Sequence, residues 1–358
     1  MRVHLLSAAE AADVAQFWVT LEERVGGGRP AISWTWTDTW LRHYGDTVTP
    51  SFALFERGGE PIGAALLVLS RRHRLGVRRL HLGTAGEPVG EGVFVEYNDV
   101  LCAPEDRRVV IRALLETIRA EPGWDELHVP GLRPEAAAVL AEELPHEASP
   151  QQSWTIRLDP DRTVYDGLKG SVRRLVRQAR ESLEPAAPEQ VVSVLAAREA
   201  MDEMALLHQE RWNAVGRPGV FASRRLAGFL TDLTEAWLDS GRVLLYRLPD
   251  SGGKALGCVV GFVEDDRFLY YQAGFRRFPD NRKRAGLLSH VEFAELCRRR
   301  GMREYELLAG DARYKRQLSG GEYNTLYWSS YRRPSIRNSG IDLARRTVAA
   351  ARRVNRSP

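Results

Sequence analysis

The sequence predicts an α/β (α+β) protein in which one pattern of strands and helices occurs twice in tandem. Seven elements recur in the same order, and two pairs of segments also resemble each other residue by residue: 61–68 beside 255–262, and 123–131 beside 301–310. Residues 61–68 and 255–262 each follow a glycine-rich turn, Gly58-Gly59 or Gly252-Gly253, which is typical of a hairpin. The shared order favours duplication of one unit over chance similarity between α/β segments.

The elements of each copy follow from apolar runs bounded by turn residues, which predict strands, and from longer periodic segments, which predict helices. In the first copy we expect strands at 52–56, 62–70 and 96–102, a helix at 105–120, a strand at 124–130, a helix at 134–143 and a strand at 153–158. In the second we expect strands at 243–248, 255–263 and 267–275, a helix at 287–300, a strand at 304–309, a short helix and a strand at 324–331.

Length and charge divide the chain into three parts. With 358 residues and 44% hydrophobic content, the chain can bury two cores, and we expect domains at 1–160 and 161–333. The remaining segment, 334–358, is an arginine-rich tail; from Arg332 onward the chain carries a formal charge of +7, which leaves −3 for the rest. The tail could dock as a helix, touch an acidic membrane or RNA, or be solvated or loosely docked, and we favour the last.

Composition also excludes several classes of protein. The three cysteines lack metal-ligand spacing and are expected to be buried thiols in a reducing cytoplasm. There is no signal-peptide core and no apolar run long enough to span a bilayer, so we expect a cytoplasmic protein. A GxSxG elbow, a GxxxxGK[ST] loop and an HExxH helix are missing and the histidines are scattered, so hydrolase and metal chemistry are disfavoured.

A basic junction between a strand and a helix is the first candidate site. Residues 276–286 place five basic side chains and Ala285-Gly286 just before the helix expected at 287–300. Free backbone N–H groups and the helix dipole favour a phosphate at such a junction. A solvent-facing basic loop is the alternative. The matching junction of the first copy, 101–108, begins its helix with two acids, so the second half is the better candidate for a nucleotide-like cofactor.

Two predicted helices carry further candidates. Lys169, Arg173, Arg177 and Arg180 line one face of a helix over 165–183, opposite an apolar stripe, so this face either contacts phosphate or RNA or is simply solvated, which we favour. Farther on, His208 and Trp212 share a helix face just before a Gly/Pro-rich loop and could border a substrate pocket. A histidine on such a face is more often a hydrogen-bonded core residue.

These features together resemble the GNAT acyltransferases, in particular the CelD/BcsL-type proteins of bacteria. The resemblance rests on the strand and helix order, on Leu269-Tyr270-Tyr271-Gln272-Ala273-Gly274-Phe275, on Ala285-Gly286-Leu287-Leu288 and on Gly310-Asp311-Ala312-Arg313-Tyr314-Lys315-Arg316. Supporting matches are 32–36, 97–104, 172–174 and 211–212, and Asp99 lies within one of them. The resemblance implies two tandem GNAT-like domains, each a mixed, mostly antiparallel sheet flanked by helices, similar to the FemAB aminoacyltransferases.

The resemblance also implies the chemistry and its residues. Family members move an acyl group to an amine, from acyl-CoA or, in the Fem-like branch, from aminoacyl-tRNA; no metal is implied. Backbone N–H groups of a splayed strand near Tyr271, Gln272, Ala273 and Gly274 would face the donor, with Arg282, Lys283, Arg284, Ala285, Gly286 and Leu287 at its phosphates. The chain keeps only part of the usual Q/R-x-x-G-x-G/A loop, so the donor is open.

For the proton transfers, a base or water route, oxyanion donors and an acid are needed. Either Glu264 or Asp311 could hold or deprotonate the amine, and Tyr271 or Tyr314 could supply the acid proton. Lys315 could pair with Asp311 or meet a donor phosphate or a substrate carboxylate; the alternative is an Asp311 helix cap with an i,i+4 ion pair.

Three function classes follow, in this order. The first is an acyl-CoA N-acyltransferase acting on an amine of a small molecule or a cell-envelope acceptor. The second is an aminoacyl-tRNA-dependent amide-bond former that uses the basic helix and the tail. The third is a noncatalytic binding protein on a GNAT scaffold. The slightly acidic body places tRNA second, because tRNA-binding proteins usually present a basic surface.

Overall fold

The computed structural model describes residues 1–27, 29–70, 76–335 and 338, and these form two compact units. The N-terminal unit combines Met1–Gly26, Tyr44–Pro150 and the chain from Tyr327 onward. The C-terminal unit combines Gly27–His43 with Gln151–Leu326. Segment 27–43, which we expected in the first domain, therefore groups with the C-terminal unit. Apart from 334, 335 and 338, the predicted basic tail lies outside the described residues.

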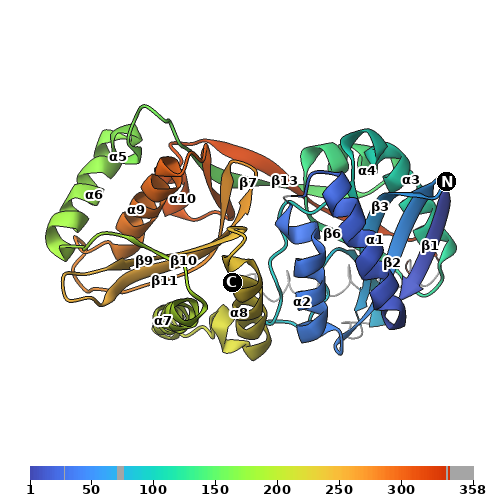
Figure 1. Cartoon of the computed structure of the whole chain (residues 1–358), viewed down its shortest axis with the longest axis horizontal. Helices are drawn as coiled ribbons and strands as arrows, with labels where there is room; N and C mark the ends of the chain where they lie inside the picture. The colour runs from blue at the N-terminus through green and yellow to red at the C-terminus, as the bar shows by residue number, and fades with distance from the viewer. Residues whose placement is uncertain (28, 71–75, 336–337, 339–358) are drawn as a thin grey trace, which may run out of the picture. The chain divides into compact units, whose positions relative to one another are not determined.

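The N-terminal unit is a mixed sheet with helices packed on it (Figure 1). Its elements are β1 (Arg2–Ser7), α1 (Ala11–Arg24), β2 (Val48–Arg57), β3 (Glu60–Ser70), β4 (Arg79–Leu82), β5 (Leu101–Cys102), α3 (Arg107–Ala120), β6 (Glu126–Leu132), α4 (Pro134–Glu143) and the second part of β13 (Tyr323–Arg332). The strand order is β1-β2-β3-β4-β6-β13, with β4 and β6 parallel and the other neighbours antiparallel. The core lies between this sheet and α3 and α4.

The C-terminal unit has the same kind of architecture. Its elements are α2 (Trp34–Tyr44), the second part of β7 (Glu147–Arg157), α5 (Val164–Gly167), α6 (Gly170–Leu183), β8 (Glu189–Val191), α7 (Val194–Asn213), α8 (Arg224–Leu238), β9 (Val243–Pro249), β10 (Ala255–Glu264), β11 (Arg267–Phe275), α9 (Ala285–Arg299), β12 (Glu304–Ala309), α10 (Arg313–Leu318) and the start of β13. The strand order is β7-β12-β11-β10-β9-β8. In Figure 1, α6 and α9 lie on one side of β9–β11, and α7 and α8 lie on the other.

Both cores confirm the predicted fold class, a mostly antiparallel α/β sheet flanked by helices. The three cysteines are buried and free, as predicted. Across the described residues, no helix is long and apolar enough to span a bilayer. The expected strand at 96–102 is reduced to Leu101–Cys102, because Tyr97 adopts a φ of 58° and breaks the extended backbone.

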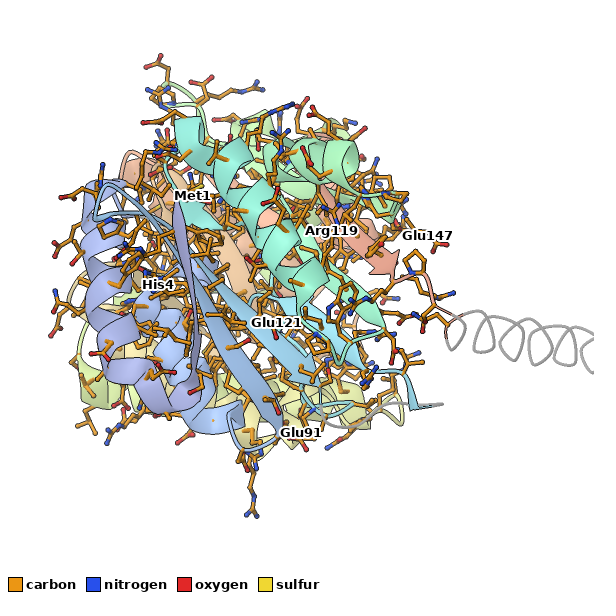
Figure 2. The ribbon with its side chains drawn as sticks, turned by 90° about the vertical axis from the view of Figure 1, so that its right-hand side faces the viewer. Met1, His4, Glu91, Arg119, Glu121 and Glu147 are labelled. Atoms are coloured by element: carbon orange, nitrogen blue, oxygen red, sulfur yellow. The ribbon has the colours of Figure 1, made fainter. Side chains whose placement is uncertain are left out.

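Arg333, just after β13, is bound to the C-terminal end of α3. Figure 2 labels Arg119, in the last turn of α3, and Glu121, just after it. The guanidinium of Arg333 donates to the carbonyl oxygens of both residues, at 2.9 Å each. The last carbonyls of a helix have no partner within the helix, so Arg333 satisfies them and fixes the chain after β13.

Candidate active site

Strands β11 and β12 separate partway along their length. Their parallel pairing covers only residues 267–269 with 304–306, although β11 continues to Phe275 and β12 to Ala309. Beyond Leu269, the edge of β11 that faced β12 is no longer held in a ladder with it. Backbone N–H and C=O groups must find partners when buried, so an open edge of this kind suits an extended ligand.

A β-bulge lies at the same point on the other edge of β11. Val260 and Gly261 of β10 face Gln272 and Tyr270, so Tyr271 is the extra residue. A bulge bends its strand and redirects local backbone groups, and bulges occur often beside active sites. The bulge thus lies where the pairing of β11 with β12 ends.

The N-terminus of α9 completes this mouth. No side chain caps the helix at Arg284, so its first N–H groups depend on the loop or on a ligand. Gly286 packs closely, because a Cβ there would lie 3.0 Å from the Phe275 ring. Of the basic residues before the helix, Arg282 forms an ion pair with Asp280 at 2.9 Å, and the Lys283 amino group lies 5.4 Å from the Phe278 ring centroid. Arg284 is exposed.

An aromatic cluster of Tyr270, His290, Tyr305 and Tyr314 lies beside the splay. The His290 ring stacks on Tyr314 at 5.1 Å and meets Tyr270 edge-on at 5.0 Å. Its Nδ1 lies 3.1 Å from the Tyr305 hydroxyl, and the hydroxyls of Tyr270 and Tyr314 share a hydrogen bond. Burial raises the pKa of both Tyr270 and Tyr314, so these phenols keep their protons at neutral pH.

His290 is buried, at 1% exposure, and its Nε2 has no hydrogen-bond partner among the described residues. Burial, followed by the positive charges of Lys315 and Arg211, lowers the pKa of His290 to about 3. His290 is therefore neutral at physiological pH. It can accept or donate one hydrogen bond without adding a charge to the site.

We expect His290 to make the fold sensitive to mild acid. The unfolded histidine, with a pKa of about 6.5, binds a proton first as the pH falls, so stability drops between that value and the folded-state pKa of about 3. The predicted loss is about 1.4 kcal/mol per pH unit in this window. The check is urea unfolding of the wild type and His290→Gln at pH 7 and 5. The carboxylates and His128 contribute equally to both proteins, so the difference between them reports His290. If the free energy of unfolding fell equally with pH in both, His290 would not be the group responsible.

The candidate catalytic residues of 311–315 have separate environments. Asp311 is exposed and forms an ion pair with Arg316 at 3.0 Å. Lys315 is buried, and its amino group donates to the carbonyl oxygens of Leu308 at 3.2 Å and Ala309 at 2.7 Å. Leu308 has a φ of 60°, so Lys315 holds a turned segment at the end of β12. Tyr314, by contrast, belongs to the aromatic cluster.

The other two catalytic candidates lie elsewhere in the C-terminal unit. Glu264 ends β10, is 2% exposed and is ion-paired with Arg267, at the hairpin end of β11. The splay opens toward the other end of that strand. The Tyr271 side chain packs edge-on against Trp36 at 5.8 Å and against Phe262 at 5.2 Å. It thus contacts α2, whereas Tyr270 contacts α9, as expected for neighbours on a strand.

The donor-binding candidates divide in the same way. Gln272, Ala273 and Gly274 continue β11 beyond the splay, and a Cβ on Gly274 would lie 2.1 Å from the Met204 oxygen of α7. Arg282, Lys283 and Arg284 precede α9, while Ala285, Gly286 and Leu287 form its first turn. The two predicted donor segments thus meet where Phe275, the last residue of β11, packs against Gly286 of α9.

The three predicted substrate residues lie in two separate places, two in the C-terminal unit and one in the N-terminal unit. The indole N–H of Trp212 donates to Nε2 of His208 at 2.9 Å, and Nδ1 of His208 lies 3.2 Å from Oε1 of Gln209. Burial lowers the pKa of His208, which keeps the ring neutral. Asp99 belongs to the N-terminal unit, where Arg107 donates to its Oδ2 at 3.1 and 3.3 Å.

Several residues of the site were not singled out by sequence reasoning. His290 lies within a predicted helix and Tyr305 between two glutamates of a predicted strand, and Arg211 was noted only in the match with Trp212. Glu306 is fully buried and accepts hydrogen bonds from Ser153 at 2.6 Å and Asn324 at 2.9 Å, and another from Thr155. A charged residue in the middle of the run 304–309 is the one signal that could have identified it.

Comparisons with known proteins agree with this geometry. Residues 170–316 match the model of a protein family described as an acetyltransferase (GNAT) domain. The match lies within the C-terminal unit and includes the separated strands β11 and β12, and it supports an acyltransferase. A search of curated proteins gave no match.

Solved structures show the same fold along most of the chain. FemX is similar with a TM-score of 0.59 and 11% identity, over 92% of this chain and 97% of that one. L-PGS from Bacillus licheniformis gives 0.55 and 12%, over 92% and 96%. The C-terminal domain of a putative lysylphosphatidylglycerol synthetase from Agrobacterium fabrum gives 0.56 and 11%, over 89% and 92%. At these identities the similarity concerns the fold alone.

Proposed function

We propose that the protein transfers an acyl group from an acyl-CoA to an amine of a small molecule or a cell-envelope component. The observation that carries the proposal is the separation of β11 from β12 directly beside the uncapped N-terminus of α9. An extended pantetheine would lie along the open edge of β11, and its phosphates would meet the first N–H groups of α9 and Arg284.

In the reaction, the amine nitrogen forms a bond to the acyl carbon and the carbon–sulfur bond breaks. Backbone N–H groups at the bulge of 270–272 stabilise the negative charge that develops on the carbonyl oxygen. The amine loses one proton, by way of water or Asp311 at the exposed end of the site, and Tyr314 delivers a proton to the departing thiolate. Lys315 positions the end of β12 through Leu308 and Ala309.

The test is a thermal shift experiment on the full chain with acetyl-CoA, a long acyl-CoA and free CoA. A donor at a hundredfold excess over its Kd stabilises the native state by about 2.7 kcal/mol. We expect this shift in the wild type and its loss in Arg284→Glu. The matched control is Arg224→Glu, because Arg224 is also exposed and begins another helix, α8, of the same unit. No shift with any CoA compound would overturn the choice of donor.

An aminoacyl-tRNA donor is the second candidate. It is favoured by the FemX-like fold and by the exposed Arg174 of α6. Against it, Arg177 and Arg180 of the same helix are each ion-paired with a glutamate. Adding an aminoacylated tRNA mixture to the thermal shift series separates the two. A shift with aminoacylated tRNA but with no CoA compound, weakening steeply as salt is raised, would favour the Fem-like reaction.

A further inference from the structure

The N-terminal unit contains a polar groove that shares no residue with the proposed acyl-transfer site. Its volume is about 920 Å³, which is within the range of small-molecule sites. Its charged and polar lining comes from three neighbouring strands and from the segment that leads into β7: Arg79, Glu126, His128, His146, Ser330 and Arg332. Glu147, labelled in Figure 2, also borders it and is exposed.

Two arginines in this groove share a single carboxylate. Oε2 of Glu126 lies 3.0 Å from Nη2 of Arg79, and Oε1 of Glu126 lies 2.9 Å from Nη2 of Arg332. Strand register produces this arrangement, because Glu126 faces Arg79 on one side and Arg332 on the other. The carboxylate neutralises one guanidinium, so the three groups keep one positive charge. Both arginine side chains remain partly exposed, at 42% and 36%.

A chain of hydrogen-bonded side chains leads from the protein interior to the same groove. The Ser70 hydroxyl lies 2.8 Å from Nε2 of His81, and Nδ1 of His81 lies 3.3 Å from Nδ1 of His128. Burial, and then the charge of Arg79, lowers the pKa of His128 to about 4, so its ring is neutral. The tautomer of the neutral His128 ring sets whether its Nε2 donates or accepts.

We propose that this groove binds an anionic group, a phosphate or a carboxylate, between Arg79 and Arg332, with His128 as its uncharged hydrogen-bond partner. Guanidinium groups bind both anions through paired charge-assisted hydrogen bonds. The surplus positive charge provides the attraction, and Glu126 keeps the two arginines in place when the groove is empty. With Glu147 at the rim the formal charges of the lining cancel, so the attraction is local to the two guanidinium groups. The site is independent of the proposed acyl-CoA chemistry.

The experiment titrates the full chain with inorganic phosphate and, separately, with succinate, and follows the imidazole C–H resonance of His128 by NMR. His128→Gln identifies that resonance. We expect a saturable shift in the wild type and a roughly tenfold weaker affinity in Arg79→Gln and in Arg332→Gln. Each of these variants leaves Glu126 with one arginine partner, so its carboxylate stays ion-paired.

The matched control is Arg78→Gln. Arg78 neighbours Arg79 in the chain and is ion-paired with Asp125 at 3.2 Å, but it does not line the groove. Its variant should bind as the wild type does. A response to phosphate alone assigns the groove to phosphate groups, and a response to succinate alone assigns it to carboxylates. No saturable shift with either anion, or equal weakening in Arg78→Gln, overturns the proposal.

Discussion

Replacing Tyr314 with phenylalanine is expected to lower kcat for acyl transfer by roughly 10²- to 10⁴-fold, the usual contribution of a positioned acid. The substitution removes one hydroxyl and keeps the ring that stacks on His290. Its partner Tyr270 would lose one hydrogen bond. Because the predicted donor contacts lie on β11 and α9, the KM for the donor should change little. Steady-state kinetics with the acyl-CoA that gives the largest thermal shift measure both quantities.

The control for this substitution is Tyr323→Phe. Tyr323 begins β13, is 47% exposed and contacts Trp154 through its ring alone. It should retain the activity of the wild type. If Tyr314→Phe also retained full kcat, Tyr314 would not be the proton donor, and water would remain as the source of that proton.

Replacing Trp36 with alanine is expected to reduce the free energy of unfolding by about 3–5 kcal/mol, the usual cost of deleting a large buried aromatic side chain. Trp36 is 2% exposed and meets Phe229, Phe262 and Tyr271 edge-on, at 5.2, 5.2 and 5.8 Å. Since Tyr271 is the extra residue of the bulge, the cavity would also loosen the backbone that faces the acyl group. We therefore expect kcat to fall as well.

Trp18→Ala is the matched control for the catalytic part of that prediction. Trp18 is equally buried, at 2%, but it packs on Phe52 in the N-terminal unit. Both variants should unfold at lower denaturant concentration, whereas only Trp36→Ala should lose activity per folded molecule. Equal activity losses would mean that Trp36 affects stability alone and does not position Tyr271.

The second half of the chain was predicted more accurately than the first. Strands expected at 243–248, 255–263, 267–275 and 304–309 appear as β9, β10, β11 and β12 with nearly the same bounds. Their apolar runs end at tight turns, so local sequence determines them. In the first half, β4 was not predicted, because Arg79-Leu80-His81-Leu82 is short and half polar. Around 97–100, the Asn98 amide bonds the carbonyls of Leu82 and Pro130, a tertiary contact that replaces a strand.

The site depended on information that is not local. Tyr270 and Tyr271 are adjacent, and alternation along a strand predicts that only one can face α9, but nothing in the sequence says which. The structure places Tyr270 there. Segment 282–287 was recognisable because a basic run before a helix is a local pattern. The approach of α2 to β11 was not, since Trp36 and Tyr271 are far apart in the chain and meet only in the folded C-terminal unit.

The division of the chain has a consequence for how the protein is made. Both units are assembled from separated stretches, and the unit that contains Met1 also requires residues from Tyr327 onward, whereas its partner is complete at Leu326. Because a ribosome makes the chain from its N-terminal side, the C-terminal unit can therefore fold first. The early strands of the N-terminal unit must wait until residues 327–332 have been made before β13 joins β6.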